Sequence, residues 1–289
     1  MNESRNLSLN PVSYVSSGSA NSIFTSSLEN TDLGFIGEFF SVSIEEKKKL
    51  ISCAANYIGG RVKLIAGTTS MELEETIYLS RYAKQKGIDD VIILPPYYFT
   101  LSADRIEQYY DVIAKCLPDQ RIYFYNFPDR TGYTIPVEVT LKLLRKYKNF
   151  VGYKDTQAGM AHTLQLIKAV KPEFPDFEIY AGFDDNFAHN VLSGGDGCIA
   201  GLSNIVPQLC HSWVQAFANE NLSEVQRIQK TINGLMEIYQ VGEPFIPYIK
   251  AAMEAHGQGE AGISSFPLLE ANKDEKQALA QILNKWLDC

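Results

Sequence analysis

A repeated alternation of short apolar runs and longer helical stretches constrains the fold of this chain most strongly. From about residue 60, each β-rich run is followed by a polar loop and then by a helical stretch of ten or more residues. This alternation is typical of βαβ units with parallel strands. The runs are apolar throughout, as expected for strands that are covered on both faces. The predicted strands are Val62–Ala66, Val91–Leu94, Ile122–Tyr125, Phe150–Tyr153, Glu178–Ala181 and Gly197–Ala200.

The number of strands favours a closed barrel. One interval before the first of these runs lies Leu33–Ile36, a plausible further strand, and the residues before it leave room for a first strand. Eight strands in a chain of 289 residues predict a (β/α)8 TIM barrel rather than an open doubly wound sheet. Helix signals fit this pattern, because Thr69 and Glu72 have capping-box spacing and Gly87 follows a cationic last turn.

Both ends of the chain depart from the repeat. Residues 1–32 contain nine Ser and five Asn, and the stretch Ser16–Asn30 has almost no apolar residues at helical spacing, so we expect an atypical, irregular first βα unit. After Ile205 the strand signal stops, and residues 205–220, 222–240, 246–256 and 273–287 are predicted as helices. We therefore expect an irregular segment (1–32), a barrel body (33–204), and a closing helix with a C-terminal helical appendage (205–289).

Composition excludes several classes of function. The net charge is −8 and no Lys/Arg-rich block occurs, which argues against nucleic acid or an anionic membrane as a partner. No apolar run approaches the length of a membrane span, and the first residues lack the pattern of a secretory signal, so a cytoplasmic location is expected. Five widely spaced cysteines without CxxC and four histidines without HxxxH favour neither a disulfide scaffold nor a metal site.

Lys154 is the sharpest candidate for chemistry. It directly follows a predicted strand, and reactive groups in this fold lie at the carboxyl ends of the strands. Desolvation there would lower the pKa of its ammonium group and supply a neutral amine. Such an amine forms a Schiff base with a ketone, and the protonated imine accepts electrons. The alternative is a strand-end lysine without chemistry, whose head group reaches solvent.

Two further side chains lie at the end of the neighbouring predicted strand and in the loop after it. The phenol of Tyr125 is placed to relay protons, although a half-buried tyrosine without a chemical role is the commoner case. Arg130, five residues later, is suited to pair with a substrate carboxylate, and an exposed loop arginine is an equal alternative.

The spacing of these residues resembles a known family. The resemblance covers roughly residues 33–289 and is to the pyruvate-dependent class I aldolases, which include dihydrodipicolinate synthase, N-acetylneuraminate lyase and 2-keto-3-deoxygluconate aldolase. The matching motifs are Tyr125-Asn126-x-Pro128-x-Arg130-Thr131-Gly132, Gly152-x-Lys154-Asp155-Thr156, Pro96-Tyr97-Tyr98, Gly182-Phe183-Asp184-Asp185 and Gly194-Gly195-Asp196-Gly197-Cys198-Ile199.

The resemblance implies a role for each matching residue. Lys154 would form the imine with pyruvate, and Tyr125 would be the proton relay beside it. Tyr98 would match a tyrosine that, in some relatives, reaches into the site of a neighbouring subunit. Gly182 and Ile199 would shape the pocket through their backbone carbonyl groups. No metal or separate cofactor is implied, because the iminium performs the electrophilic work.

One loop departs from the family pattern. Gly34, Phe35 and Ile36 occupy the place of a Gly-Thr-Thr-Gly-Glu loop, which would hold the pyruvate carboxylate. Neither Phe35 nor Ile36 donates a hydrogen bond from its side chain, although backbone N–H groups there are still able to bind a carboxylate. A catalytically silent barrel, used for binding or assembly, is therefore an alternative to an active enzyme.

We expect a Schiff-base aldolase that cleaves or forms a 2-keto-3-deoxy sugar acid, with pyruvate as the keto component and an aldehyde as the second substrate. The Lys154-Asp155-Thr156 sequence resembles the sugar-acid enzymes, whereas Arg130 in an Arg-Thr-Gly setting resembles dihydrodipicolinate synthase. Dihydrodipicolinate synthase or N-acetylneuraminate lyase activity therefore remains an alternative. The resemblance also implies a homo-oligomer, either a dimer or a tetramer.

Overall fold

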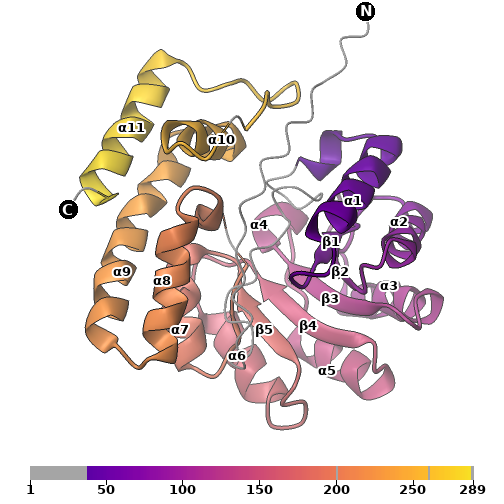
Figure 1. Cartoon of the computed structure of the whole chain (residues 1–289). Helices are drawn as coiled ribbons and strands as arrows, with labels where there is room; N and C mark the ends of the chain where they lie inside the picture. The colour runs from indigo at the N-terminus through magenta and orange to yellow at the C-terminus, as the bar shows by residue number, and fades with distance from the viewer. Residues whose placement is uncertain (1–37, 200, 260, 288–289) are drawn as a thin grey trace, which may run out of the picture. The chain divides into compact units, whose positions relative to one another are not determined.

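The computed structural model describes residues 38–199, 201–259 and 261–287, which fall into two compact units. The larger unit contains the described residues up to 199, and the smaller unit contains those from 201 onward. The larger unit carries the sheet and the predicted site residues, and the smaller unit consists of helices (Figure 1).

A parallel sheet of six strands forms the centre of the larger unit. Each strand pairs with the next one along the chain, and the sheet curls into part of a barrel (Figure 1). All six strands predicted from Val62 onward are confirmed, whereas Leu33–Ile36 and the expected first strand lie outside the described residues. The strands are β1 (Ile65–Gly67), β2 (Asp90–Ile93), β3 (Arg121–Asn126), β4 (Phe150–Asp155), β5 (Glu178–Ala181) and β6 (Gly197–Cys198).

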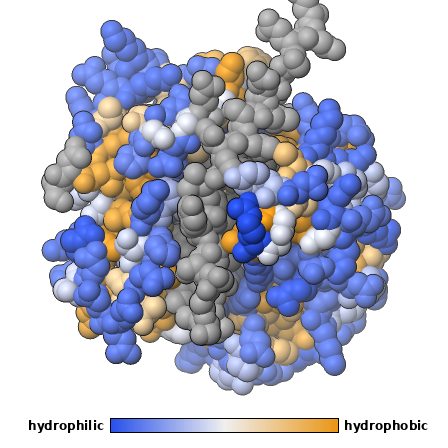
Figure 2. All heavy atoms as spheres, in the orientation of Figure 1, coloured by the Kyte–Doolittle hydropathy of each residue, from blue (hydrophilic) through white to orange (hydrophobic). Residues whose placement is uncertain are grey.

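Helices connect successive strands and cover the outer face of the sheet (Figure 1). Figure 2 shows a mostly hydrophilic outer surface on the side of the molecule where α2 and α3 lie. The α-helices of this unit are α1 (Ile44–Ile58), α2 (Leu73–Gln85), α3 (Ala103–Cys116), α4 (Pro128–Thr131), α5 (Val137–Lys146), α6 (Ala161–Val170) and α7 (Phe187–Leu192). Two short 3-10 helices, η2 (Phe39–Ser41) and η3 (Asp184–Asn186), complete the set.

Apolar side chains of the strands pack into two separate layers, one on each face of the sheet. On β3, Ile122 and Phe124 face the helices and belong to the large outer core, whereas Tyr123 and Tyr125 belong to a smaller cluster on the inner face. Tyr180 of β5 belongs to the same inner cluster. The sheet is thus buried on both faces, which explains why its strands are apolar throughout.

The strand bounds differ from the prediction at two places that matter for the site. Strand β4 continues to Asp155, so Lys154 is its penultimate residue instead of following it. Strand β1 begins at Ile65 instead of Val62, because its pairing with β2 starts at the register pair Ile65↔Asp90. A strand extends only where its neighbour offers backbone partners, and sequence pattern alone does not show where that begins.

The predicted capping box at Thr69 and Glu72 is wrong. Helix α2 begins at Leu73, and Glu72 is its N-cap residue without a side-chain cap. The hydroxyl of Thr69 instead accepts a hydrogen bond of 2.9 Å from the backbone N–H of Leu94, which joins the loop after β1 to the end of β2. The helix end was predicted correctly, because Gly87 follows the C-cap with φ of +83°.

The smaller unit contains the four helical stretches predicted after Ile205. None of the helices in the described ranges is both long and apolar enough to span a membrane. The unit comprises η4 (Leu202–Asn204), α8 (Pro207–Ala218), α9 (Leu222–Leu235), η5 (Met236–Gln240), α10 (Ile246–Ala255) and α11 (Lys273–Leu287).

Candidate active site

Lys154 and Tyr125 lie side by side at the carboxyl ends of two adjacent strands. They are register partners in the β3–β4 ladder, so their side chains emerge on the same face of the sheet. Both are buried, with 3% of Lys154 and 5% of Tyr125 exposed. The Nζ atom of Lys154 lies 4.3 Å from the centroid of the Tyr125 ring. The structure therefore brings the two predicted catalytic side chains into direct contact.

A row of side chains leads from this pair towards Arg130. The Tyr125 ring stacks on the Phe127 ring, with centroids 6.0 Å apart. The guanidinium carbon of Arg130 lies 5.5 Å from the centroid of the Phe127 ring. Arg130 is exposed and belongs to α4, the short helix directly after β3. Its charge thus stands at the solvent end of a row whose buried end is Lys154.

The ends of β5 and β6 bring the two predicted pocket-shaping residues near this row. The backbone N–H of Gly182 donates to the carbonyl oxygen of Asp155 at 2.9 Å. A Cβ atom on Gly182 would lie 1.9 Å from the hydroxyl oxygen of Thr156, so only glycine fits there. Ile199 is buried in the inner cluster, and its N–H donates to Ala181.

The other predicted site residues are exposed or lie outside the described ranges. Tyr98 is 77% exposed and packs edge-on against Phe99, with ring centroids 4.7 Å apart. Gly34, Phe35 and Ile36, the predicted carboxylate loop, fall before residue 38 and lie outside the described residues.

A buried polar cluster on the opposite face of the same two strands was not predicted. We call it the Asp155 cluster; it comprises Asn126, Asp155, Gln157, His162 and Thr163. One carboxylate oxygen of Asp155 accepts from the Asn126 amide at 2.7 Å and from the Gln157 amide at 3.2 Å. The other accepts from the Thr163 hydroxyl at 2.7 Å and lies 2.9 Å from Nδ1 of His162.

These contacts keep Asp155 ionised. Burial on its own raises the pKa of this carboxyl group. The hydrogen bond and charge of His162 lower the pKa, as do the hydrogen bonds from Asn126 and Thr163, and together they outweigh burial. The pKa of Asp155 therefore lies below its ordinary value. A usable signal was present in the sequence: Asn126 follows Tyr125, and Asp155 follows Lys154, so both must face the helices if the first pair faces inward.

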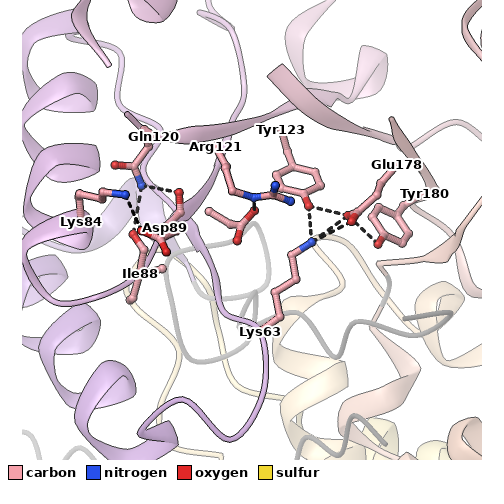
Figure 3. A network of polar contacts seen from close by, with 10 residues as sticks. Lys63, Lys84, Ile88, Asp89, Gln120, Arg121, Tyr123, Glu178 and Tyr180 are labelled. Atoms are coloured by element: carbon pink, nitrogen blue, oxygen red, sulfur yellow. Dashed lines mark hydrogen bonds and ion pairs between the residues drawn. The ribbon is translucent and has the colours of Figure 1, made fainter. Parts of the chain in front are cut away.

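A second polar network closes the inner face at the amino ends of the strands, and we call it the floor network. Lys63 donates to both carboxylate oxygens of Glu178, at 3.0 and 2.9 Å, and to the Tyr123 hydroxyl at 2.5 Å. The hydroxyl groups of Tyr123 and Tyr180 donate to Glu178 at 2.5 and 2.9 Å (Figure 3). Arg121, also drawn in Figure 3, pairs with Asp90 at 2.8 Å.

The carboxyl ends of the strands present a buried amine, a phenol beside it, and an arginine at the exposed end of the row. A buried amine can add to a carbonyl carbon, and the adjacent phenol can move protons for it. No three His, Cys, Asp or Glu side chains within residues 38–199, 201–259 and 261–287 are grouped so that they could hold a metal ion.

The chain is similar in sequence to known proteins. Escherichia coli (strain K12) has a probable 2-dehydro-3-deoxy-D-pentonate aldolase, YjhH, that is 30% identical over 253 residues, which cover 87% of this chain and 83% of YjhH. A 4-hydroxy-tetrahydrodipicolinate synthase of Kosmotoga olearia is 33% identical over 257 residues, which cover 89% of this chain and 85% of the synthase.

A solved structure shows the same fold. It is that of YagE, a prophage protein of the dihydrodipicolinic acid synthase family from E. coli K12, in complex with pyruvate. YagE matches with a TM-score of 0.85 and 28% identity, covering 89% of this chain and 86% of YagE, which confirms the predicted barrel fold class. The model of the dihydrodipicolinate synthetase family matches residues 31–286. The chain therefore belongs to the dihydrodipicolinate synthetase family.

Proposed function

We propose that this protein is a class I aldolase that cleaves or forms a 2-keto-3-deoxy sugar acid, with pyruvate as the keto component. The observation that carries the proposal is the buried contact between Lys154 and Tyr125, with Nζ 4.3 Å from the ring centroid. Family membership supports it, since the family consists of lyases that use pyruvate through a Schiff base. YagE, a relative of the same family, binds pyruvate in its crystal structure.

In the cleavage direction, the amine of Lys154 adds to the C2 carbonyl of the sugar acid and water leaves, which gives an iminium ion. Tyr125 gives its phenolic proton to the departing water, and the resulting phenolate takes the proton from the C4 hydroxyl group while the C3–C4 bond breaks. The aldehyde departs, and the electron pair of the broken bond moves through C3 into the iminium to give an enamine. Protonation at C3 and hydrolysis of the imine then release pyruvate and restore Lys154.

The choice of a sugar acid as substrate rests on the similarity of this chain to two relatives and on one sequence motif. YjhH is a probable 2-dehydro-3-deoxy-D-pentonate aldolase, and YagE a putative 2-dehydro-3-deoxy-D-gluconate aldolase that is 31% identical over 78% of this chain. Lys154-Asp155-Thr156 supports the same choice. Arg130, at the exposed end of the row, is placed to pair with the carboxylate of an aldehyde partner, and this favours a synthase as the second candidate.

Deuterium exchange into pyruvate tests the chemistry without knowledge of the aldehyde. Conversion of the imine to the enamine removes a proton from the pyruvate methyl group, and return in D2O incorporates deuterium. We expect NMR to show exchange with the wild-type protein and none above the buffer rate with Lys154→Ala. A folded wild-type protein that catalyses no exchange would support the silent barrel instead, and Phe35→Thr with Ile36→Thr would then be the restoring pair.

A panel of second substrates distinguishes the two candidate activities. We expect pyruvate release from 2-keto-3-deoxygluconate or a 2-keto-3-deoxypentonate, and little condensation of pyruvate with aspartate semialdehyde. The opposite preference would establish the synthase. Release of pyruvate from N-acetylneuraminate would establish the third activity.

The remaining parts of the proposal concern assembly and location. We propose a homo-oligomer, a dimer or a tetramer, with Tyr98 at a subunit contact, since its exposed ring and that of Phe99 form an apolar pair. We also propose a cytoplasmic location. Light scattering of the purified chain and cell fractionation test these two statements.

A further inference from the structure

The Asp155 cluster lies directly behind the proposed catalytic pair. Tyr125↔Lys154 and Asn126↔Asp155 are consecutive register pairs of the β3–β4 ladder. The cluster and the catalytic pair therefore share the same two strand ends. They lie on opposite faces of the sheet because successive side chains of a strand alternate between the faces. Any shift of one strand end against the other would therefore move Lys154 relative to Tyr125.

The cluster ties several segments to those strand ends. The Asn126 amide donates to Asp155, while its amide oxygen accepts from the backbone N–H of Ile135 at 2.9 Å. This second bond holds Ile135, which lies after helix α4 and Arg130, to the end of β3. His162 and Thr163 anchor the same carboxylate to the first turn of α6.

Backbone hydrogen bonds continue the connection to the next strand. The N–H of Thr156 donates to the carbonyl oxygen of Asn126 at 2.8 Å, and the N–H of Gly182 donates to that of Asp155 at 2.9 Å. The ends of β3, β4 and β5 are thus held to one another around a single buried carboxylate. A carboxylate with its acceptor sites filled in this way is costly to move, because each displaced donor would remain buried without a partner.

We propose that Asp155 is a positioning residue for the imine chemistry of Lys154. It acts through Asn126 and the shared strand ends, which hold the Tyr125 phenol against the Lys154 amine, and it does not itself touch the substrate. The inference rests on the proposed function. It assigns a role in turnover to a side chain that faces the helices and not the barrel interior.

Asp155→Asn provides the test, because it keeps the shape of the side chain but replaces one acceptor oxygen with an amide donor. The new amide nitrogen would face either the donors of Asn126 and Gln157 or the Thr163 hydroxyl and Nδ1 of His162. In either orientation, at least two of the four groups around the carboxylate must move or change their hydrogen-bonding role. We expect the exchange rate at saturating pyruvate to fall at least about tenfold, since small misplacements of reacting groups cost up to about a hundredfold in rate. The pyruvate concentration for half-maximal exchange should change by less than about threefold, because the substrate contacts are retained.

Gln120→Met is the matched control for lost structure. Its side-chain amide donates to the backbone oxygens of Ile88 and Asp89 at 3.1 and 2.9 Å, and the residue is buried directly before β3, at the amino ends of the strands. The variant should unfold at a lower temperature than the wild type and keep its exchange rate per folded molecule.

Three outcomes are distinguishable. A selective loss of exchange rate in Asp155→Asn, with folded protein and near-normal half-saturation, supports the proposal. Unchanged exchange in that variant, or a loss matched by Gln120→Met, overturns the positioning role while leaving the aldolase proposal intact. Absence of exchange in the wild-type protein overturns the proposed function, and the positioning role with it.

Discussion

The two ends of the barrel interior contain the same pair of residue types in different surroundings. At the amino ends of the strands, Lys63 contacts Tyr123; at the carboxyl ends, Lys154 contacts Tyr125. Both tyrosines belong to β3, two residues apart, and both face inward. Each Nζ atom lies over the ring of its tyrosine, 5.1 Å from the centroid for Lys63 and 4.3 Å for Lys154, and Lys63 also donates to the Tyr123 hydroxyl.

The carboxylate of Glu178 is the centre of the floor network. Glu178 accepts two hydrogen bonds from Lys63 and one from each of Tyr123 and Tyr180. Burial, together with the charges of Glu178 and Asp90, raises the pKa of Tyr123. A phenol held protonated beside a paired ammonium ion is suited to connect strands and not to move protons. The comparison shows that a Lys–Tyr contact acquires chemistry only from its surroundings.

Replacing each lysine by methionine should separate the two ends most sharply. Lys154→Met removes the imine-forming amine, so deuterium exchange into pyruvate should vanish. Lys63→Met should lower the melting temperature, because it leaves Glu178 without its cation, but the folded protein should retain exchange. Exchange in Lys154→Met, or its loss in folded Lys63→Met, would reverse the assignment of the two ends.

Removing each tyrosine hydroxyl makes a finer comparison on a single strand. Tyr125→Phe should lower the exchange rate by about a hundredfold or more, which is the usual contribution of a positioned proton-transfer group. Tyr123→Phe should leave the rate unchanged and cost about 1 kcal/mol of unfolding free energy through its lost hydrogen bond to Glu178. Exchange kinetics and denaturant titrations of both variants measure these effects.

The floor also depends on a glycine. A Cβ atom on Gly152 would lie 2.2 Å from the ring of Tyr123, its register partner on β3. Gly152→Ala should therefore destabilise the protein by about 1–3 kcal/mol, as overpacking of a core usually does. A denaturation midpoint equal to that of the wild type would show that the Tyr123 ring moves aside freely. In a Tyr123→Ala background, Gly152→Ala should cost much less stability, because the ring that the added methyl group would meet is absent.

A pH-dependent effect on stability is expected at Glu178. Burial raises the pKa of Glu178, but the charge of Lys63 and the hydrogen bonds from Tyr123 and Lys63 outweigh it, so the pKa lies below the ordinary 4.5. The ion pair therefore stabilises the fold above pH 4.5, and this contribution is lost as pH falls through the lower folded-state pKa. Glu178→Gln should cost about 1–2 kcal/mol at neutral pH, a modest value because the pair is only partly buried.

That cost should shrink on acidification. Denaturant titrations of the wild type and Glu178→Gln at neutral pH and in the acid range measure the change. A difference between the two proteins that stays constant with pH would show that the Glu178 carboxylate does not stabilise the fold through its charge.

Sequence pattern predicted the strands of the larger unit well for a physical reason. Strands covered on both faces must be apolar throughout, and their carboxyl ends meet at one edge, so Lys154 and Tyr125 were expected to lie at the same end of the barrel. Their contact was then fixed by register, which is a property of the paired strands.

What the pattern did not predict depends on partners that are distant in sequence. Lys63 and Glu178 are 115 residues apart, and no local signal connects them. The Asp155 cluster required the first turn of α6 to lie over the strand end, which sets where His162 is placed. At Thr69, a bond to the neighbouring strand replaced the expected local cap.

Mapping a trapped adduct onto the two lysines of the inner face tests the central claim most directly. The wild-type protein would be incubated with pyruvate and borohydride, digested, and analysed by peptide mass spectrometry. We predict a reduced pyruvyl adduct on Lys154 and an unmodified Lys63. An adduct on Lys63 in place of Lys154, or no adduct on the folded protein at saturating pyruvate, would contradict the account.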